Sequence, residues 1–203
     1  MTLSRPTRPA PRPSTPTWAR RLIPVLVLLA LMWATEIVDL LTPLNLDRFG
    51  IRPRDLGHLQ GIVLSPFLHL GFAHLIANSL SLVVLGSLLA LTTRHLWLVT
   101  GGVILLGGLG VWLLGGPSTV HIGASGVVYG YAAFLAVYGF VARRFGSAAV
   151  GVLVIVVYGS MLWGVLPLRA GVSWQGHLFG ALAGVLMAVW LGRQDRAETR
   201  PRT

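Results

Sequence analysis

Four polar residues stand out in a strongly apolar part of the chain: His74, Asn78, Ser125 and His177. Ser125 lies in the glycine-flanked segment 123–126, where a nearby histidine could take the hydroxyl proton as a general base. His74 and Asn78 are four residues apart, a spacing that puts both on one face of a helix. Together they could donate hydrogen bonds to a developing oxyanion. These residue types and spacings predict serine-type acyl transfer, although serine and asparagine also join helices in membrane proteins and a lone histidine can be a packing residue.

A carboxylate that could complete a catalytic triad is missing from this part of the chain. None of the six acidic residues falls between Leu56 and Gln194; they are Glu36, Asp39, Asp47, Asp55, Asp195 and Glu198. Val127 also stands where the hydrolase motif Gly-x-Ser-x-Gly has its last glycine. We therefore expect a dyad of Ser125 and His177. The chain has no cysteine, so a thiolate nucleophile or metal site is excluded, and we expect no metal and no organic cofactor.

The composition predicts the environment of these residues. The 203 residues are 54% hydrophobic and 11% charged, with a mean hydropathy of +0.74. Several apolar runs approach the ~20 residues that cross a bilayer as a helix. We therefore expect an all-α, polytopic membrane protein. The net charge of +10 comes from arginines between apolar runs, which set topology, so no nucleic-acid partner is expected.

Three regions follow from the pattern. Residues 1–19 mix Pro, Arg, Ser and Thr with few apolar residues and are expected to be a disordered, basic cytoplasmic tail. Residues 20–192 should form the six-helix membrane domain, and residues 193–203 a second basic cytoplasmic tail. The apolar run after Arg21 could be a signal peptide, but its length favours a first transmembrane helix.

Six helices are expected in the membrane domain, at about 22–41, 72–91, 96–114, 125–141, 148–165 and 174–191. The longest polar connection, about residues 42–70, mixes charged and apolar residues, which suits a loop lying in the membrane interface. Six spans put both termini on one side, and twelve of the sixteen arginines then fall on that side: Arg5, Arg8, Arg12, Arg20, Arg21, Arg94, Arg143, Arg144, Arg193, Arg196, Arg200 and Arg202. The four on the other side are Arg48, Arg52, Arg54 and Arg169. The positive-inside rule predicts cytoplasmic termini.

With this topology, the second, fourth and sixth helices all begin at the outer face, where their first turns carry the four polar residues. Gly180 and Gly184 form a small-residue face on the sixth helix, and we expect it to pack against Gly126 and Gly130 of the fourth. Tyr129, one turn below the serine, could stack on the histidine or serve only in packing. We also expect the two glycines beside the serine, at positions 123 and 126, to leave room for a substrate backbone.

In these motifs, the sequence resembles the rhomboid intramembrane serine proteases. The resemblance covers about residues 20 to 192 and rests on three motifs in the family's order: His74-x-x-x-Asn78, Gly123-x-Ser125-Gly126 and His177-x-x-Gly180-x-x-x-Gly184. It implies a six-helix rhomboid-type bundle, with Ser125 as nucleophile and His177 as base. It also implies an oxyanion hole formed with the help of His74 and Asn78.

The resemblance extends to two supporting residues and fails at one point. Tyr129 matches the tyrosine that stacks on the family's catalytic histidine. His69 matches a histidine at the head of the second helix, where it would shape the loop or a water site. Many rhomboids carry a Trp-Arg pair in the loop after the first helix, and here that loop has arginines but no tryptophan. This departure concerns the conformation of the loop and not the dyad.

The expected function is endopeptidase cleavage of transmembrane protein substrates near their outer ends, in a bacterial plasma membrane. The active site would open to the extracytoplasmic side, and the lipid bilayer would be the medium of the enzyme. A non-proteolytic scaffold that binds transmembrane helices is the main alternative, although such relatives typically lose the serine or the histidine. A transporter is less consistent, because its polar residues would lie near the midplane. Nothing in the sequence specifies an oligomeric state.

Overall fold

The computed structural model describes residues 20–168 and 171–199, so the expected tail 1–19, Arg169 and residues 200–203 lie outside the described part. Within it, the chain is helical and forms no strand. Six helical segments are long and apolar enough to cross a membrane: Ile23–Leu41, Phe72–Thr92, Leu96–Leu114, Ser125–Ala142, Phe145–Val165 and Trp174–Glu198. The prediction of an all-α, six-span membrane protein is therefore confirmed.

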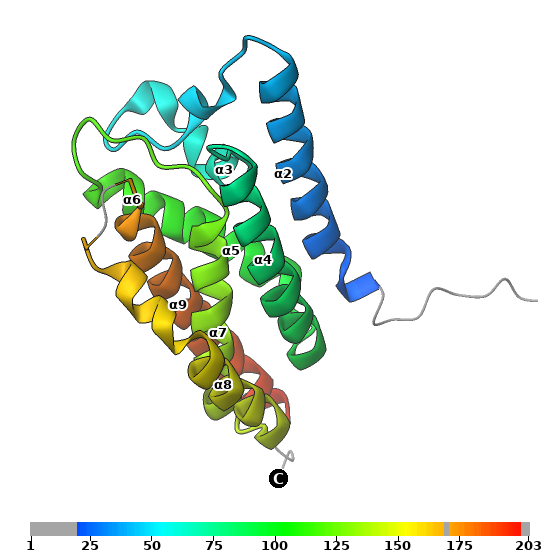
Figure 1. Cartoon of the computed structure of the whole chain (residues 1–203). Helices are drawn as coiled ribbons and strands as arrows, with labels where there is room; N and C mark the ends of the chain where they lie inside the picture. The colour runs from blue at the N-terminus through cyan, green and yellow to red at the C-terminus, as the bar shows by residue number, and fades with distance from the viewer. Residues whose placement is uncertain (1–19, 169–170, 200–203) are drawn as a thin grey trace, which may run out of the picture.

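Figure 1 shows the six spans as a bundle with α2 at its edge and α7 among the other helices. The longer elements are α2 (Ile23–Leu41), α4 (Phe72–Thr92), α5 (Leu96–Gly102), the π-helical η4 (Val103–Gly107), α6 (Gly108–Leu114), α7 (Ser125–Ala142), α8 (Phe145–Tyr158), the 3₁₀ helix η5 (Gly159–Val165) and α9 (Trp174–Glu198). Short turns form the first loop: η1 (Leu46–Phe49), η2 (Leu56–His58), α3 (Gly61–Leu64) and η3 (Ser65–Phe67).

Two helix boundaries differ from the expected ones. The fifth span starts at Phe145, before the expected residue 148, and its last part is the 3₁₀ helix η5. The sixth continues to Glu198 instead of ending near residue 191. Asp195 explains the extension, because its side chain is only 2% exposed. It accepts hydrogen bonds from the Tyr138 hydroxyl and from Nε2 of His95. A boundary at residue 192, with a separate tail beyond it, was therefore wrong for the described residues.

Small residues let α7 and α9 pack very closely. A methyl group built on Gly180 would lie 2.1 Å from the carbonyl oxygen of Gly126, and one on Gly184 would lie 2.1 Å from that of Gly130. Both distances are far below van der Waals contact, so the two backbones touch along this line. The arrangement holds the N-terminal ends of α7 and α9 at a fixed separation.

The outer surface of the bundle is apolar where it would meet lipid. Only 11% of the fifth span is buried, against 50% of the span formed by α7. Along α8, exposed apolar side chains include Val152, Leu153, Ile155, Val156 and Val157. Side chains that would be unfavourable in water are stable against hydrocarbon, so this surface fits a protein integral to the membrane.

The first loop is fixed to the end of α6 without the Trp-Arg pair. Arg54 donates from Nη1 to the carbonyl oxygens of Leu113 and Gly115, at 3.0 and 2.9 Å. The indole nitrogen of Trp112 donates to the carbonyl oxygen of Asp55 at 3.1 Å. A tryptophan and an arginine therefore still join loop and bundle, but the tryptophan comes from α6.

Candidate active site

The dyad residues meet where α7 and α9 begin. Ser125 is the first residue of α7, and His177 lies in the first turn of α9. The hydroxyl oxygen of Ser125 and Nε2 of His177 are 2.9 Å apart, which is hydrogen-bond distance. His177 is only 8% exposed. The glycine contacts one and two turns below set this separation, because they fix how closely the two helix ends approach.

The imidazole of His177 is held on two sides. Its Nδ1 lies 2.8 Å from the carbonyl oxygen of Gly164 in η5. A carbonyl can only accept, so Nδ1 carries the proton and Nε2 is the unprotonated nitrogen that faces the Ser125 hydroxyl. Tyr129 stacks on the ring, with centroids 4.1 Å apart and planes 6° apart. Sequence reasoning missed Gly164, because any residue can supply a backbone carbonyl and its type gives no signal.

Hydrogen-bond donors gather beside the dyad. Asn78 is 6% exposed, and its Nδ2 has no hydrogen-bond partner among the described residues. A buried amide without an acceptor is unfavourable in a folded protein and is most often found where a ligand completes it. The N–H of Ser125, in the first turn of α7, has no acceptor within that helix. Both donors suit an oxygen that becomes negatively charged next to Ser125.

The glycines next to Ser125 do not leave room for a substrate, contrary to the expectation. Gly123 has a φ of +104°, and a Cβ there would lie 2.7 Å from Cε1 of His74. A Cβ on Gly126 would lie 3.2 Å from the carbonyl oxygen of Gly176. The space is therefore used by the ring of His74 and by the backbone of α9. Both glycines permit the packing of the site, and His74 is held directly against the nucleophile loop.

His69 supports this loop from the side of α4. Its Nε2 accepts from the N–H of Ala124 at 3.4 Å, and its Nδ1 lies 3.3 Å from the carbonyl oxygen of Phe67. The ring packs edge-on against that of His74, with centroids 5.1 Å apart. Burial, together with the neighbouring His74, lowers the pKa of His69 to about 4. His69 is therefore neutral at physiological pH and holds the residue that precedes the nucleophile.

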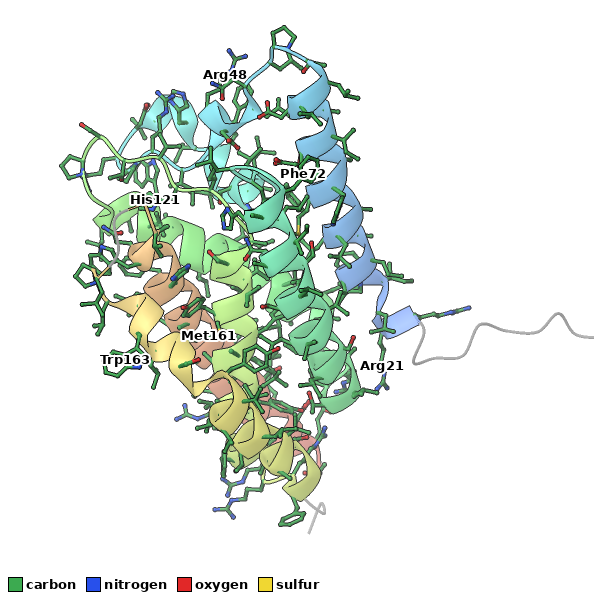
Figure 2. The ribbon with its side chains drawn as sticks, viewed as in Figure 1. Arg21, Arg48, Phe72, His121, Met161 and Trp163 are labelled. Carbon is green, nitrogen blue, oxygen red and sulfur yellow. The ribbon has the colours of Figure 1, made fainter. Side chains whose placement is uncertain are left out.

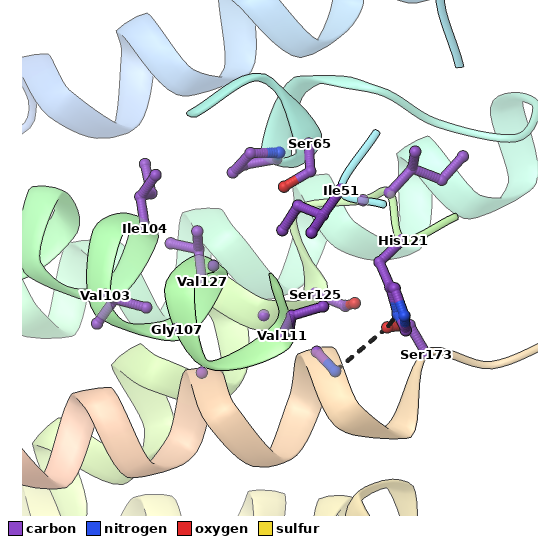
Figure 3. Close-up of a pocket in the computed structure, with 17 residues that line it drawn as sticks. Ile51, Ser65, Val103, Ile104, Gly107, Val111, His121, Ser125, Val127 and Ser173 are labelled. Atoms are coloured by element: carbon purple, nitrogen blue, oxygen red, sulfur yellow. Dashed lines mark hydrogen bonds between the residues drawn. The ribbon is translucent and has the colours of Figure 1, made fainter. Parts of the chain in front are cut away.

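Two cavities adjoin the dyad. The larger, about 1170 Å³, is lined by Ser125, His177, His74 and Asn78 and extends between α4 and the segment of η5 that contains Met161. Figure 2 shows Met161 on the side of the bundle formed by η5. The smaller, about 40 Å³, lies behind Ser125, with Val103, Val111 and the glycines of α7 and α9 among its lining (Figure 3). The larger cavity is wide enough to admit an extended peptide segment.

Comparisons with known proteins agree with this architecture. The family model described as the rhomboid domain matches residues 56–194. An uncharacterized protein of Mycobacterium tuberculosis, Rv1337, is 42% identical over 209 residues, covering 94% of this chain and 86% of the relative. Another from Mycobacterium leprae, ML1171, is 43% identical over 185 residues, covering 86% of this chain and 72% of the relative. The matched domain includes every residue that forms the dyad and its surroundings, and the chain belongs to the rhomboid family.

Proposed function

We propose that this protein is an intramembrane serine endopeptidase in which Ser125 is the nucleophile and His177 is the general base. The observation that carries the proposal is the 2.9 Å contact between the hydroxyl of Ser125 and the unprotonated nitrogen of His177. The carbonyl of Gly164 lies where a triad would have its carboxylate, and it selects the same tautomer. A dyad is thus sufficient to orient the base.

The reaction follows from these positions. His177 takes the proton of the Ser125 hydroxyl as the oxygen attacks the scissile carbonyl, and a tetrahedral oxyanion forms. The amide of Asn78, the ring of His74 and the N–H of Ser125 would stabilise this charge. The imidazolium then gives its proton to the leaving amine, and the peptide bond breaks. Water, deprotonated by His177, hydrolyses the acyl-enzyme and restores the hydroxyl.

The proposed substrates are transmembrane proteins that reach the site from the lipid bilayer. A helical segment hides its carbonyls in hydrogen bonds, so cleavage requires a stretch of extended backbone, which small residues favour. The cavity between α4 and η5 supports this route, because it contacts both dyad residues and its lining includes apolar residues such as Leu70, Val120 and Met161. The proposed chemistry uses protein groups alone and involves no metal, organic cofactor or nucleic acid.

The proposed orientation places both termini in the cytoplasm of a bacterium and the dyad near the outer face of its plasma membrane. Arginine supports it: Arg21 and Arg48 lie at opposite ends of the bundle (Figure 2), and the end with Arg21 has most of the arginines. Reporters inserted near Arg94 should read cytoplasmic, and one inserted near Arg48 should read external. The reverse pattern would put the dyad at the cytoplasmic face.

The test uses the full chain purified in detergent, a serine-directed fluorophosphonate and a fluorescent transmembrane peptide. The wild type should be labelled at Ser125 and should cleave the peptide, whereas Ser125→Ala and His177→Ala should each lose nearly all of both activities. Their combination should cost little more than either alone, because nucleophile and base act as one unit. Ser87→Ala, in the inner half of α4, is the matched control and should keep wild-type rates.

Two outcomes would contradict the proposal. Full cleavage by Ser125→Ala, in a preparation free of contaminating proteases, would exclude Ser125 as the nucleophile. A folded wild type that binds the transmembrane peptide without cleaving it, and that the probe does not label, would instead favour the scaffold function.

A further inference from the structure

We infer that His121 is a positioning residue for the dyad: it joins the loop that leads to Ser125 to the cap of the helix that carries His177. The inference rests on the proposed function, because it concerns the alignment of nucleophile and base. His121 is four residues before Ser125, is 6% exposed and touches neither reacting atom of the dyad.

The ring of His121 bridges two segments that are distant in sequence. Its Nδ1 lies 2.6 Å from the hydroxyl oxygen of Ser173, and its Nε2 lies 2.8 Å from that of Thr119. Its backbone N–H and carbonyl both pair with Ile51 of the first loop, each at 2.9 Å. Three segments are therefore held by one residue: the nucleophile loop, the first loop and the start of α9.

Ser173 passes this constraint to His177. Its hydroxyl oxygen accepts from the N–H of Gly176 at 3.2 Å and thereby caps α9. Its carbonyl accepts from the N–H of His177 at 3.1 Å, which is the first hydrogen bond of the helix at the base. The position of Ser173 thus determines where the first turn of α9, and with it the imidazole, begins.

The protons of this cluster fit a single arrangement. The Thr119 hydroxyl donates to the carbonyl oxygen of Gly116 at 2.7 Å, so its oxygen accepts from Nε2–H of His121. Nδ1 is then the unprotonated nitrogen and accepts from the hydroxyl of Ser173, whose oxygen remains free to accept from Gly176. Burial lowers the pKa of His121, which favours the neutral ring that this arrangement requires. Each donor in the chain has one acceptor.

The cluster lies at the active site itself. Figure 3 shows His121 and Ser173 together at one end of the small cavity that Ser125 also lines. One arm of the His121 bridge leads to the nucleophile and the other to the base, so its loss changes the distance between them. A displacement of about 1 Å in an aligned site can lower the rate by ~10².

The experiment compares three variants of the full chain in detergent. His121→Phe keeps a flat ring but removes both side-chain hydrogen bonds, and it should react with the fluorophosphonate at least about tenfold more slowly than the wild type. His121→Asn keeps an acceptor near the position of Nδ1 and should recover most of that loss. His58→Phe is the matched control, because the partner of His58 is Asp55 within the same outer loop, and it should react at the wild-type rate. Rates are measured well below the melting temperature of each variant.

A double-mutant cycle tests the route through the helix cap. Ser173→Ala should slow the reaction as His121→Phe does, and the double variant should be no slower than the worse single variant, because both break the same bridge. For peptide cleavage, kcat should fall while KM stays near the wild-type value. This split separates positioning from a general loss of structure, which the rescue by asparagine also excludes.

The outcomes separate the two proposals. If the wild type reacts and His121→Phe, while folded, reacts equally fast, the role of His121 is refuted and the proposed function stands. If His121→Phe does not fold, an unimpaired Ser173→Ala or multiplicative effects of Ser173→Ala and His121→Asn would refute it instead. If the folded wild type does not react at Ser125, the proposed function fails, and the positioning role fails with it.

Discussion

The contact between Gly180 of α9 and Gly126 of α7 offers a sharp test of how the dyad is aligned. Gly180→Ala adds one methyl group, which would lie 2.1 Å from the carbonyl oxygen of Gly126 and 2.9 Å from its Cα. These neighbours are backbone atoms and cannot rotate away. Since carbon atoms in proteins approach other heavy atoms to about 3.5 Å, the helices must separate by roughly 1 Å or more.

The size of the effect follows from this displacement. Overpacking of a tight contact typically destabilises a protein by about 1–3 kcal/mol. Gly180 is three residues after His177, so the separation also draws the base away from Ser125, and a shift of about 1 Å can lower the rate by ~10². Gly146→Ala in α8 is the matched control, because a Cβ there meets nothing within 4 Å. The same change should stabilise that helix by about 0.5–1 kcal/mol.

Two measurements in detergent decide the matter: the melting temperature, and the fluorophosphonate rate at a temperature where every variant is folded. Gly180→Ala should melt below the wild type and react far more slowly, whereas Gly146→Ala should melt at or above it and react normally. Gly184→Ala makes an equally short contact one turn further from the dyad, so it should lose similar stability and less rate. A Gly180→Ala protein with wild-type melting and rate would refute the argument that this contact sets the dyad distance.

Three further predictions concern single side chains. Asn78→Ala should lower the rate of peptide cleavage by ~10²–10³ with little change in melting temperature, because its buried amide nitrogen has no partner among the described residues; a large loss of stability at an unchanged rate would assign it to packing. Asp195→Ala leaves the hydroxyl of Tyr138 and the ring of His95 without their acceptor and should destabilise the protein by about 3 kcal/mol, seen as a lower melting temperature at an unchanged fluorophosphonate rate, and a wild-type melting temperature would show that the inner end of α9 is not held there. Burial and the charge of Asp39 raise the pKa of Asp47 to about 6, so the folded protein binds this proton more tightly than the unfolded chain does; its contribution to stability is greatest below about pH 4 and falls as the pH rises toward 6, and Asp47→Asn should remove this fall from the plot of melting temperature against pH, whereas an unchanged plot would contradict it.

The sequence was sufficient to predict the helices and the identity of the dyad. Apolar runs near the length of a bilayer leave the backbone little choice but to form helices, because every N–H and carbonyl must be satisfied internally. Within such runs, a polar side chain is unfavourable enough to be noticed, which is why Ser125 and His177 stood out. The spacing of Gly180 and Gly184 also predicted the face by which α9 meets α7, since small residues four apart align on one side of a helix.

What the sequence could not provide were contacts made by the backbone and by residues of common types. The carbonyl of Gly164 orients the base, but a carbonyl belongs to every residue, so only the fold shows which one is in reach. The glycine at position 123 was expected to admit substrate, and the structure fills its space with His74, because the meaning of a missing side chain depends on what lies opposite. Similarly, the charged end of α9 looked like a tail until its partners were known: Asp195 is buried against Tyr138 of α7.

His121 illustrates the same limit most clearly. In the sequence it is one histidine in a loop, with no spacing that relates it to Ser173, which lies 52 residues further along the chain. Only the tertiary structure brings the two together, because α7 and α9 must first pack through their glycines before the loop and the helix cap can meet. Local residue patterns thus determined which groups could react, whereas the long-range packing of three helix ends determined how those groups are aligned.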